Sequence, residues 1–129
     1  MDRETRQELL ELTDRMAELQ REKGRLAEER ERLYRRCDPI RARCLVKIAL
    51  EKDEKGKPLY SNEQLRRAAS TLELESDQEY PQIQGQIRES LTRERELDIE
   101  HARLGDRRVI LMADAGMQVP TAPPSLPYG

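Results

Sequence analysis

The sequence predicts an all-α fold in which two long helices form an antiparallel coiled-coil hairpin that bends near Pro39 and Pro81. Charged residues make up 39% of the chain and aromatic residues only 3%, which is typical of long helices packed along a narrow apolar seam. Apolar residues recur at helical spacing on both sides of one turn-rich segment, residues 53–61. The flanking segments, about 2–52 and 62–115, are nearly equal in length, as the helices of a hairpin are.

The first helix, expected over about residues 2–52, carries a heptad seam. Its apolar positions follow one another mostly by steps of three and four: Leu9, Leu12, Met16, Leu19, Leu26, Leu33, Cys37, Ile40 and Cys44. Lys23 and Arg30 interrupt the seam, where long stems cover apolar surface while the charged ends reach water. Cys37 and Cys44 lie about 10 Å apart along one helix face, too far for a disulfide with each other. We expect both to be buried, with a bridge between chains as the alternative.

The segment 53–61 is expected to be the tip of the hairpin. Gly56 and Pro58 are residues that end helices, and Ser61 with Gln64 forms a capping box that starts the second helix. Folding about Gly56 pairs residues whose numbers add up to about 113–117. In that register almost every apolar seam residue faces another apolar residue.

Each helix contains a proline that follows an acidic residue able to cap a helix. Asp38 comes directly before Pro39, and Asp77 lies about one turn before Pro81. We expect a break at each proline, with the segment of about 39–76 forming a separate tip beyond the bend. Two kinked but continuous helices are the alternative.

Four of the seven prolines lie in residues 118–129. The hairpin domain is therefore expected to end at residue 117 and to be followed by a disordered, proline-rich tail. A docking peptide for the groove of a partner protein is the alternative role of this tail.

The composition argues against several classes of function. Net charge is −2, from 24 basic and 26 acidic residues, so no overall field attracts nucleic acid or membrane. The N-terminal segment lacks the apolar run of a signal peptide, and no stretch approaches the roughly 20 apolar residues that span a bilayer. We therefore expect a cytoplasmic protein without a membrane partner. Because no phosphate loop, nucleophile elbow or metal motif accompanies the single histidine, His101, we expect no enzyme, cofactor or metal site.

One short segment predicts self-association. Val109, Ile110, Leu111 and Met112 make the helix apolar on every side, which indicates burial all round. The polar N-terminal segment lies across the hairpin from it and cannot cover it. With Met117, these residues form the expected interface of a homo-oligomer or of a complex with a protein partner. Capping by the folded-back tail is the alternative.

A basic strip on the first helix is a candidate contact for nucleic acid. Its candidate residues are Arg30, Arg32, Arg35, Arg36 and Arg43. In the expected register, however, the acidic segment 73–79 lies across from Arg35, Arg36 and Arg41. Internal ion pairs of this kind, each worth less than about 1 kcal/mol when exposed, are the preferred interpretation.

The expected tip carries Asp53, Glu54 and Tyr60, which are candidate contact residues for a larger enzyme. An acidic hairpin tip can deliver carboxylates to a magnesium ion in an enzyme channel. In outline the tip resembles that of the Gre-type transcript-cleavage factors, which insert such a hairpin into RNA polymerase. A solvated turn, in which the acids lie beside neighbouring lysines, is the preferred alternative.

The connector Gly56-Lys57-Pro58, the aromatic Tyr60 and the helix start Ser61-Asn62-Glu63 resemble a recurrent pattern in small helical proteins of bacteria and their phages. The resemblance covers about residues 51–80 and implies a helical hairpin from a phage or mobile element. No catalytic role comes with it. The leading hypothesis is a non-enzymatic coiled-coil assembly protein. A nucleic-acid-binding accessory factor and a modulator that inserts its tip into a larger enzyme are the alternatives.

Overall fold

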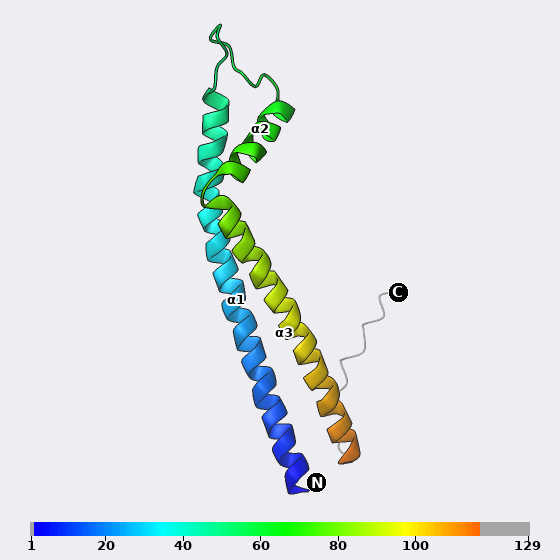
Figure 1. Cartoon of the computed structure of the whole chain (residues 1–129). Helices are drawn as coiled ribbons and strands as arrows, with labels where there is room; N and C mark the ends of the chain where they lie inside the picture. The colour runs from blue at the N-terminus through cyan, green and yellow to red at the C-terminus, as the bar shows by residue number, and fades with distance from the viewer. Residues whose placement is uncertain (1, 117–129) are drawn as a thin grey trace, which may run out of the picture. The chain divides into compact units, whose positions relative to one another are not determined.

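The structure, a computed structural model, describes residues 2–116 and consists of three α-helices (Figure 1). In chain order they are α1 (Arg3–Leu50), α2 (Glu63–Ser76) and α3 (Tyr80–Asp114). Residues 2–116 form no strand, and their only β-type pairing is an isolated bridge between Lys52 and Pro58. The prediction of an all-α, hairpin-like fold is confirmed. The predicted tail, residues 118–129, lies outside the described residues.

The helices form two compact units. The central unit, residues 24–94, contains the C-terminal part of α1, the whole of α2 and the beginning of α3. Among the described residues, the terminal unit contains residues 2–23 and 95–116.

In the central unit, the predicted seam of α1 forms the core with α3. The buried cluster consists of Leu33, Cys37, Ile40, Cys44, Ile83 and Ile87, with Leu74, Tyr80 and Leu91 packed against it. Its α1 members follow one another by three or four residues, so they form one stripe of the helix. Cys37 and Cys44 are both buried and free, as predicted, and burial raises the pKa of the Cys44 thiol.

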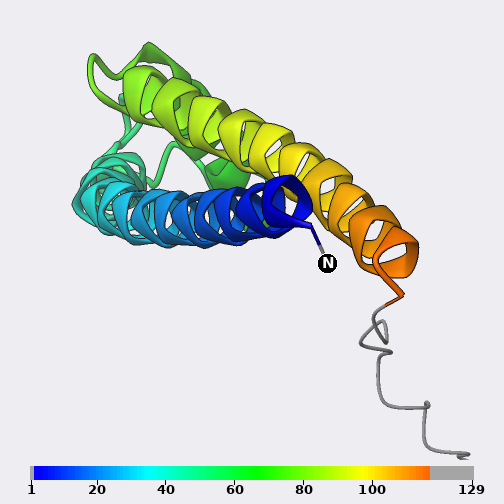
Figure 2. The same cartoon turned by 90° about the horizontal axis from the view of Figure 1, so that it is seen from below.

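In the terminal unit, the N-terminal part of α1 and the C-terminal part of α3 run side by side (Figure 2). Leu19 on α1 and Leu97 on α3 are both fully buried, and Leu111 is buried further along α3. Ion pairs flank this small core: Arg15 with Glu100 (3.0 Å), Glu8 with Arg107 (3.0 Å) and Lys23 with Asp98.

The expected helix break at Pro39 is absent, because α1 continues through this residue to Leu50. Asp38 is therefore part of the helix and caps nothing. Pro39 has no N–H, so the carbonyl of Arg35 loses its helical hydrogen bond. Pro39 is exposed, while Cys37 and Ile40 on either side of it are buried in the core. Their packing holds the helix together across the proline.

The second helical segment is interrupted, in contrast, between Ser76 and Tyr80. Pro81 is the second residue of α3, a position where a missing N–H costs little because the first turn lacks helical acceptors. Ser61 was predicted to cap α2, and this was wrong by one residue. The cap is Asn62, whose side-chain oxygen accepts a hydrogen bond from the Leu65 N–H at 2.8 Å. Both residue types cap helices well, so their order alone did not distinguish them.

The predicted pairing register is confirmed for some pairs and shifted for others by up to about one helical turn. Arg15 with Glu100 and Glu8 with Arg107 pair within the predicted register. In the central unit it placed residues 70–74 opposite Arg43, but Arg43 binds Asp77. The prediction assumed helices that run alongside each other from the tip. In the central unit, α2 is inclined to α1, so its residues advance less along α1 than the prediction assumed (Figure 1).

The two prolines allow a matched test of this interpretation. Replacing Pro39 with alanine should raise the free energy of unfolding by about 2–3 kcal/mol, because α1 regains a hydrogen bond and loses a ring clash. Replacing Pro81 with alanine should change it by less than about 1 kcal/mol, because Pro81 already suits the first turn of α3. Urea unfolding followed by circular dichroism measures both. Equal changes in the two variants would contradict the continuous α1.

Candidate interaction surfaces

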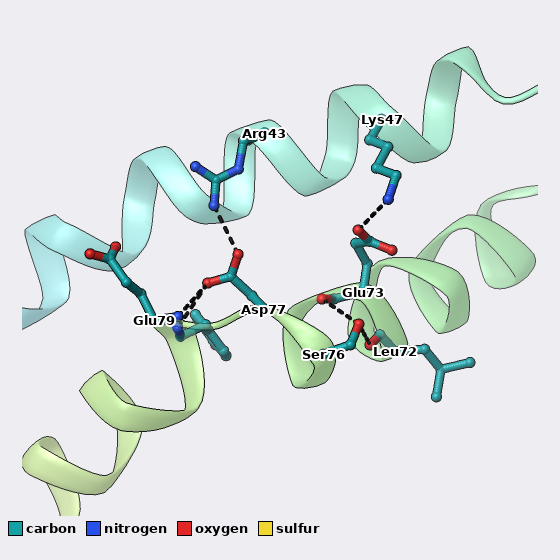
Figure 3. Close-up of polar contacts among 8 residues, drawn as sticks. Arg43, Lys47, Leu72, Glu73, Ser76, Asp77 and Glu79 are labelled. Carbon is teal, nitrogen blue, oxygen red and sulfur yellow. Dashed lines mark hydrogen bonds and ion pairs between the residues drawn. The ribbon is translucent and has the colours of Figure 1, made fainter.

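The basic strip of α1 is largely engaged in ion pairs within the central unit. Arg43 binds Asp77 at 2.8 Å and Lys47 binds Glu73 at 2.6 Å, both across to the α2 region (Figure 3). Arg30 binds Glu94 at 2.8 Å and is only 13% exposed. Pairing with the 73–79 segment occurs as expected, but through Arg43 and Lys47 rather than through the predicted bases.

The remaining arginines of the strip are exposed. Arg35 pairs with Glu31 one turn earlier on the same helix, at 3.3 Å. Arg41 donates a hydrogen bond to the Tyr80 hydroxyl and lies over its ring, 5.6 Å from the centroid. Within residues 2–116, Arg32 and Arg36 take part in no ion pair. Arg32 and Arg36 are therefore the arginines of the strip that are exposed and take part in no ion pair within residues 2–116.

Asp77 connects α1, α2 and α3 (Figure 3). One carboxylate oxygen accepts hydrogen bonds from the backbone N–H groups of Glu79 and Tyr80, at 3.0 and 2.9 Å, and so caps the start of α3. The other oxygen accepts from Arg43. These bonds, above all the one from the Tyr80 N–H, hold the pKa of Asp77 below its ordinary value. The carboxylate thus fixes the direction in which the chain leaves α2.

The acidic tip is a compact turn rather than an open pair of carboxylates. The Asp53 carboxylate accepts hydrogen bonds from the backbone N–H groups of Lys55 and Lys57, at 2.9 and 3.0 Å. Gly56 adopts a positive φ of 78°, which closes the turn. Glu54 is exposed beside these lysines. Among residues 2–116, no group of three or more metal-binding side chains occurs.

A shallow groove of about 320 Å³ lies between the end of α1 and α2. Its lining residues are Ile48, Glu51, Tyr60, Leu65, Ala68, Ala69, Leu72, Glu73 and Ser76. Leu65 and Leu72 are exposed, and the Leu72 side chain points away from α1 (Figure 3). Tyr60, the third predicted tip residue, belongs to this groove. Its partial withdrawal from water and the nearby Glu51 raise the pKa of its phenol.

The last two turns of α1 are apolar on the outer side as well. Leu45, Val46 and Leu50 are all more than half exposed, whereas Cys44 and Ile48 on the inner side are buried. The sequence signal was present, because CLVKIAL at residues 44–50 is apolar all round the helix, as 109–112 is. An exposed apolar surface was predicted only for 109–112.

The predicted interface at 109–112 is divided between the core and the surface of the terminal unit. Leu111 is 7% exposed and packs within the unit, and Met112 is half-buried. Val109 and Ile110 remain 43% and 51% exposed. The helix pair therefore covers part of this segment after all, and Val109 and Ile110 remain available for an interface. Met117 lies outside the described residues.

No protein-family model matches the chain, and neither a curated protein nor a solved structure matches it. None of the helices within residues 2–116 has the length and apolar character needed to cross a membrane.

The role of Asp77 predicts how stability depends on pH. A carboxylate whose pKa is lowered by folding stabilises the folded state above its unfolded pKa of about 3.9. That stability is lost as the pH falls through the lower, folded pKa. Replacing Asp77 with alanine should lower the melting temperature at pH 7, and the difference between wild type and variant should shrink as the pH falls below about 3.9. Thermal melts followed by circular dichroism test this, with Glu75→Ala as an exposed acidic control on α2. A difference that persists unchanged at pH 2 would contradict the assignment.

Proposed function

We propose that the chain is a non-enzymatic interaction protein that assembles with copies of itself and with a protein partner. One observation carries the proposal. Within residues 2–116, eleven apolar side chains are buried and eleven large ones are exposed. A protein whose helices pack only in pairs always leaves some apolar surface in water. Exposed apolar residues that form contiguous patches, however, are typical of interaction sites.

Six of the eleven exposed apolar residues lie in the central unit between residues 45 and 72: Leu45, Val46, Leu50, Leu59, Leu65 and Leu72. Leu65 and Leu72 line the groove beside α2, whereas Leu45, Val46 and Leu50 are exposed at the end of α1. Covering apolar surface stabilises a complex by about 25 cal/mol for each Å² removed from water. The end of α1 and the groove beside α2 therefore supply the main driving force for association.

A second candidate function, nucleic-acid binding, is favoured by one observation. Arg32 and Arg36 lie one turn apart on α1, are exposed and form no ion pair within residues 2–116. Two phosphate contacts would give a weak association with a salt slope of about −1.4 on a single strand. Internal pairing of Arg30 and Arg43 removes two of the five candidates from such a surface.

Light scattering coupled to size exclusion tests the leading proposal. The mass should rise above the 15.1 kDa of one chain as the concentration increases. The mass should not fall in 1 M NaCl. At this ionic strength, interactions between exposed charges more than about 3 Å apart are largely screened, whereas apolar contacts are not weakened. A 15.1 kDa particle at every concentration and salt would overturn self-assembly.

The nucleic-acid alternative has its own test. Fluorescence anisotropy of a labelled single-stranded oligonucleotide should show binding at low salt that the double variant Arg32→Glu, Arg36→Glu abolishes. The matched control is Arg21→Glu, Arg25→Glu, because these exposed arginines have the same spacing on the same helix. Equal binding by both variants would overturn this candidate.

A further inference from the structure

We propose that self-assembly is head to tail: the groove between α1 and α2 of one copy binds an exposed face of α3 in a second copy. This face, the α3 face, consists of Ile99, Arg103, Arg107 and Ile110. The inference rests on the proposed self-assembly and specifies which two surfaces meet.

The groove is apolar with acidic residues in its lining. Leu65 and Leu72 are separated by two turns of α2 and are both exposed, with two alanines between them. The only charged residues in the lining are Glu51 and Glu73. Lys47 already neutralises Glu73 through a 2.6 Å ion pair, which leaves Glu51 as the excess charge of the groove. The groove therefore accepts apolar side chains accompanied by a cation.

The α3 face has the complementary chemistry. Its four members are spaced by four, four and three residues, which places them on one side of the helix. Ile99 and Ile110 are 55% and 51% exposed, and they flank the two arginines along the helix. Arg107 is held by Glu8, whereas Arg103 is exposed and forms no ion pair within residues 2–116. The face thus offers apolar anchors at helical spacing together with one uncompensated cation, which suits a helix that docks in a groove.

Charge decides between the symmetric and the head-to-tail arrangement. A two-fold contact uses the same surface on both copies, so two grooves would bring together two surfaces with an excess negative charge, and two α3 faces would bring together two with an excess positive charge. Like charges opposed across an interface disfavour the complex. Only the contact of a groove with an α3 face places Glu51 and Arg103 on opposite sides. A contact of this kind leaves each copy with one unused groove or face, so it continues as an open chain or closes as a ring.

Two single variants and one control test the proposal in the full-length chain. Leu72→Glu introduces a charge into the groove, and Ile110→Glu introduces one into the α3 face; both side chains are exposed, so the fold should tolerate the changes. Leu10→Glu is the matched control, because Leu10 is 54% exposed on α1 outside both surfaces. Circular dichroism should show the wild-type helix content for all three variants.

Light scattering should give monomers for Leu72→Glu and for Ile110→Glu alone, while the control assembles like wild type. Mixed in equal amounts, the two variants should form a particle of about twice the 15.1 kDa monomer mass, because one intact groove then meets one intact α3 face. If either variant alone still forms a defined dimer, or the mixture stays monomeric, the head-to-tail contact is wrong although self-assembly stands. If wild type itself is monomeric, the proposed function fails first.

Discussion

A pair of helices buries only one stripe of side chains on each partner, and this constraint determines most of what the chain shows. In the central unit the buried stripe of α1 extends from Leu33 to Cys44. Ile83 and Ile87 of α3 belong to the same buried cluster. The remainder of each helix surface faces water. A high content of charge is the physical consequence, since charged residues keep exposed helix faces soluble and pair across the seam.

Because each helix buries only one stripe, a few polar contacts are important for fixing how the helices are positioned along one another. A seam of leucine and isoleucine is tolerant of sliding, because apolar packing is not directional. Asp77 is directional: its carboxylate accepts from two backbone N–H groups of the α3 start and from Arg43 of α1. It ties the junction between α2 and α3 to one level of α1. Lys47 and Glu73 do the same one turn away, and Arg30 with Glu94 does so further down the unit.

The fold class followed from the sequence because it depends on period and composition, which are properties of single segments. The seam from Leu33 to Cys44 was predicted residue by residue, since a helical repeat specifies one face whatever lies opposite. Register was predicted only in part: Arg15 with Glu100 and Glu8 with Arg107 fit the predicted pairing, whereas Arg43 with Asp77 does not. It depends on the inclination of α2 to α1, which arises from packing between elements and leaves no local pattern.

Local rules failed where two of them competed. Pro39 carries a strong signal for a helix break, but the buried side chains at positions 37 and 40 outweigh it. Ser61 and Asn62 are both good caps, and only the chain path selects Asn62. For the surfaces, the acidic tip is a turn closed by Asp53, in line with the preferred interpretation, whereas the predicted segment at 109–112 is partly covered. The groove of Leu65 and Leu72 was missed because their exposure becomes evident only when α2 is placed against α1.

Exposed apolar surface and a thin core both result from helices that pack in pairs. Few side chains are fully buried in either unit, so each helix pair is held by a modest apolar contribution. In the proposed assembly, a second copy that covers Leu65 and Leu72, or Ile99 and Ile110, would bind only the folded chain and would therefore stabilise it by mass action. Assembly and folding would then be coupled properties of this chain. Its apolar residues lie on several exposed stripes as well as in the core, so the proposed contact between copies would supply part of the stability that the thin core does not.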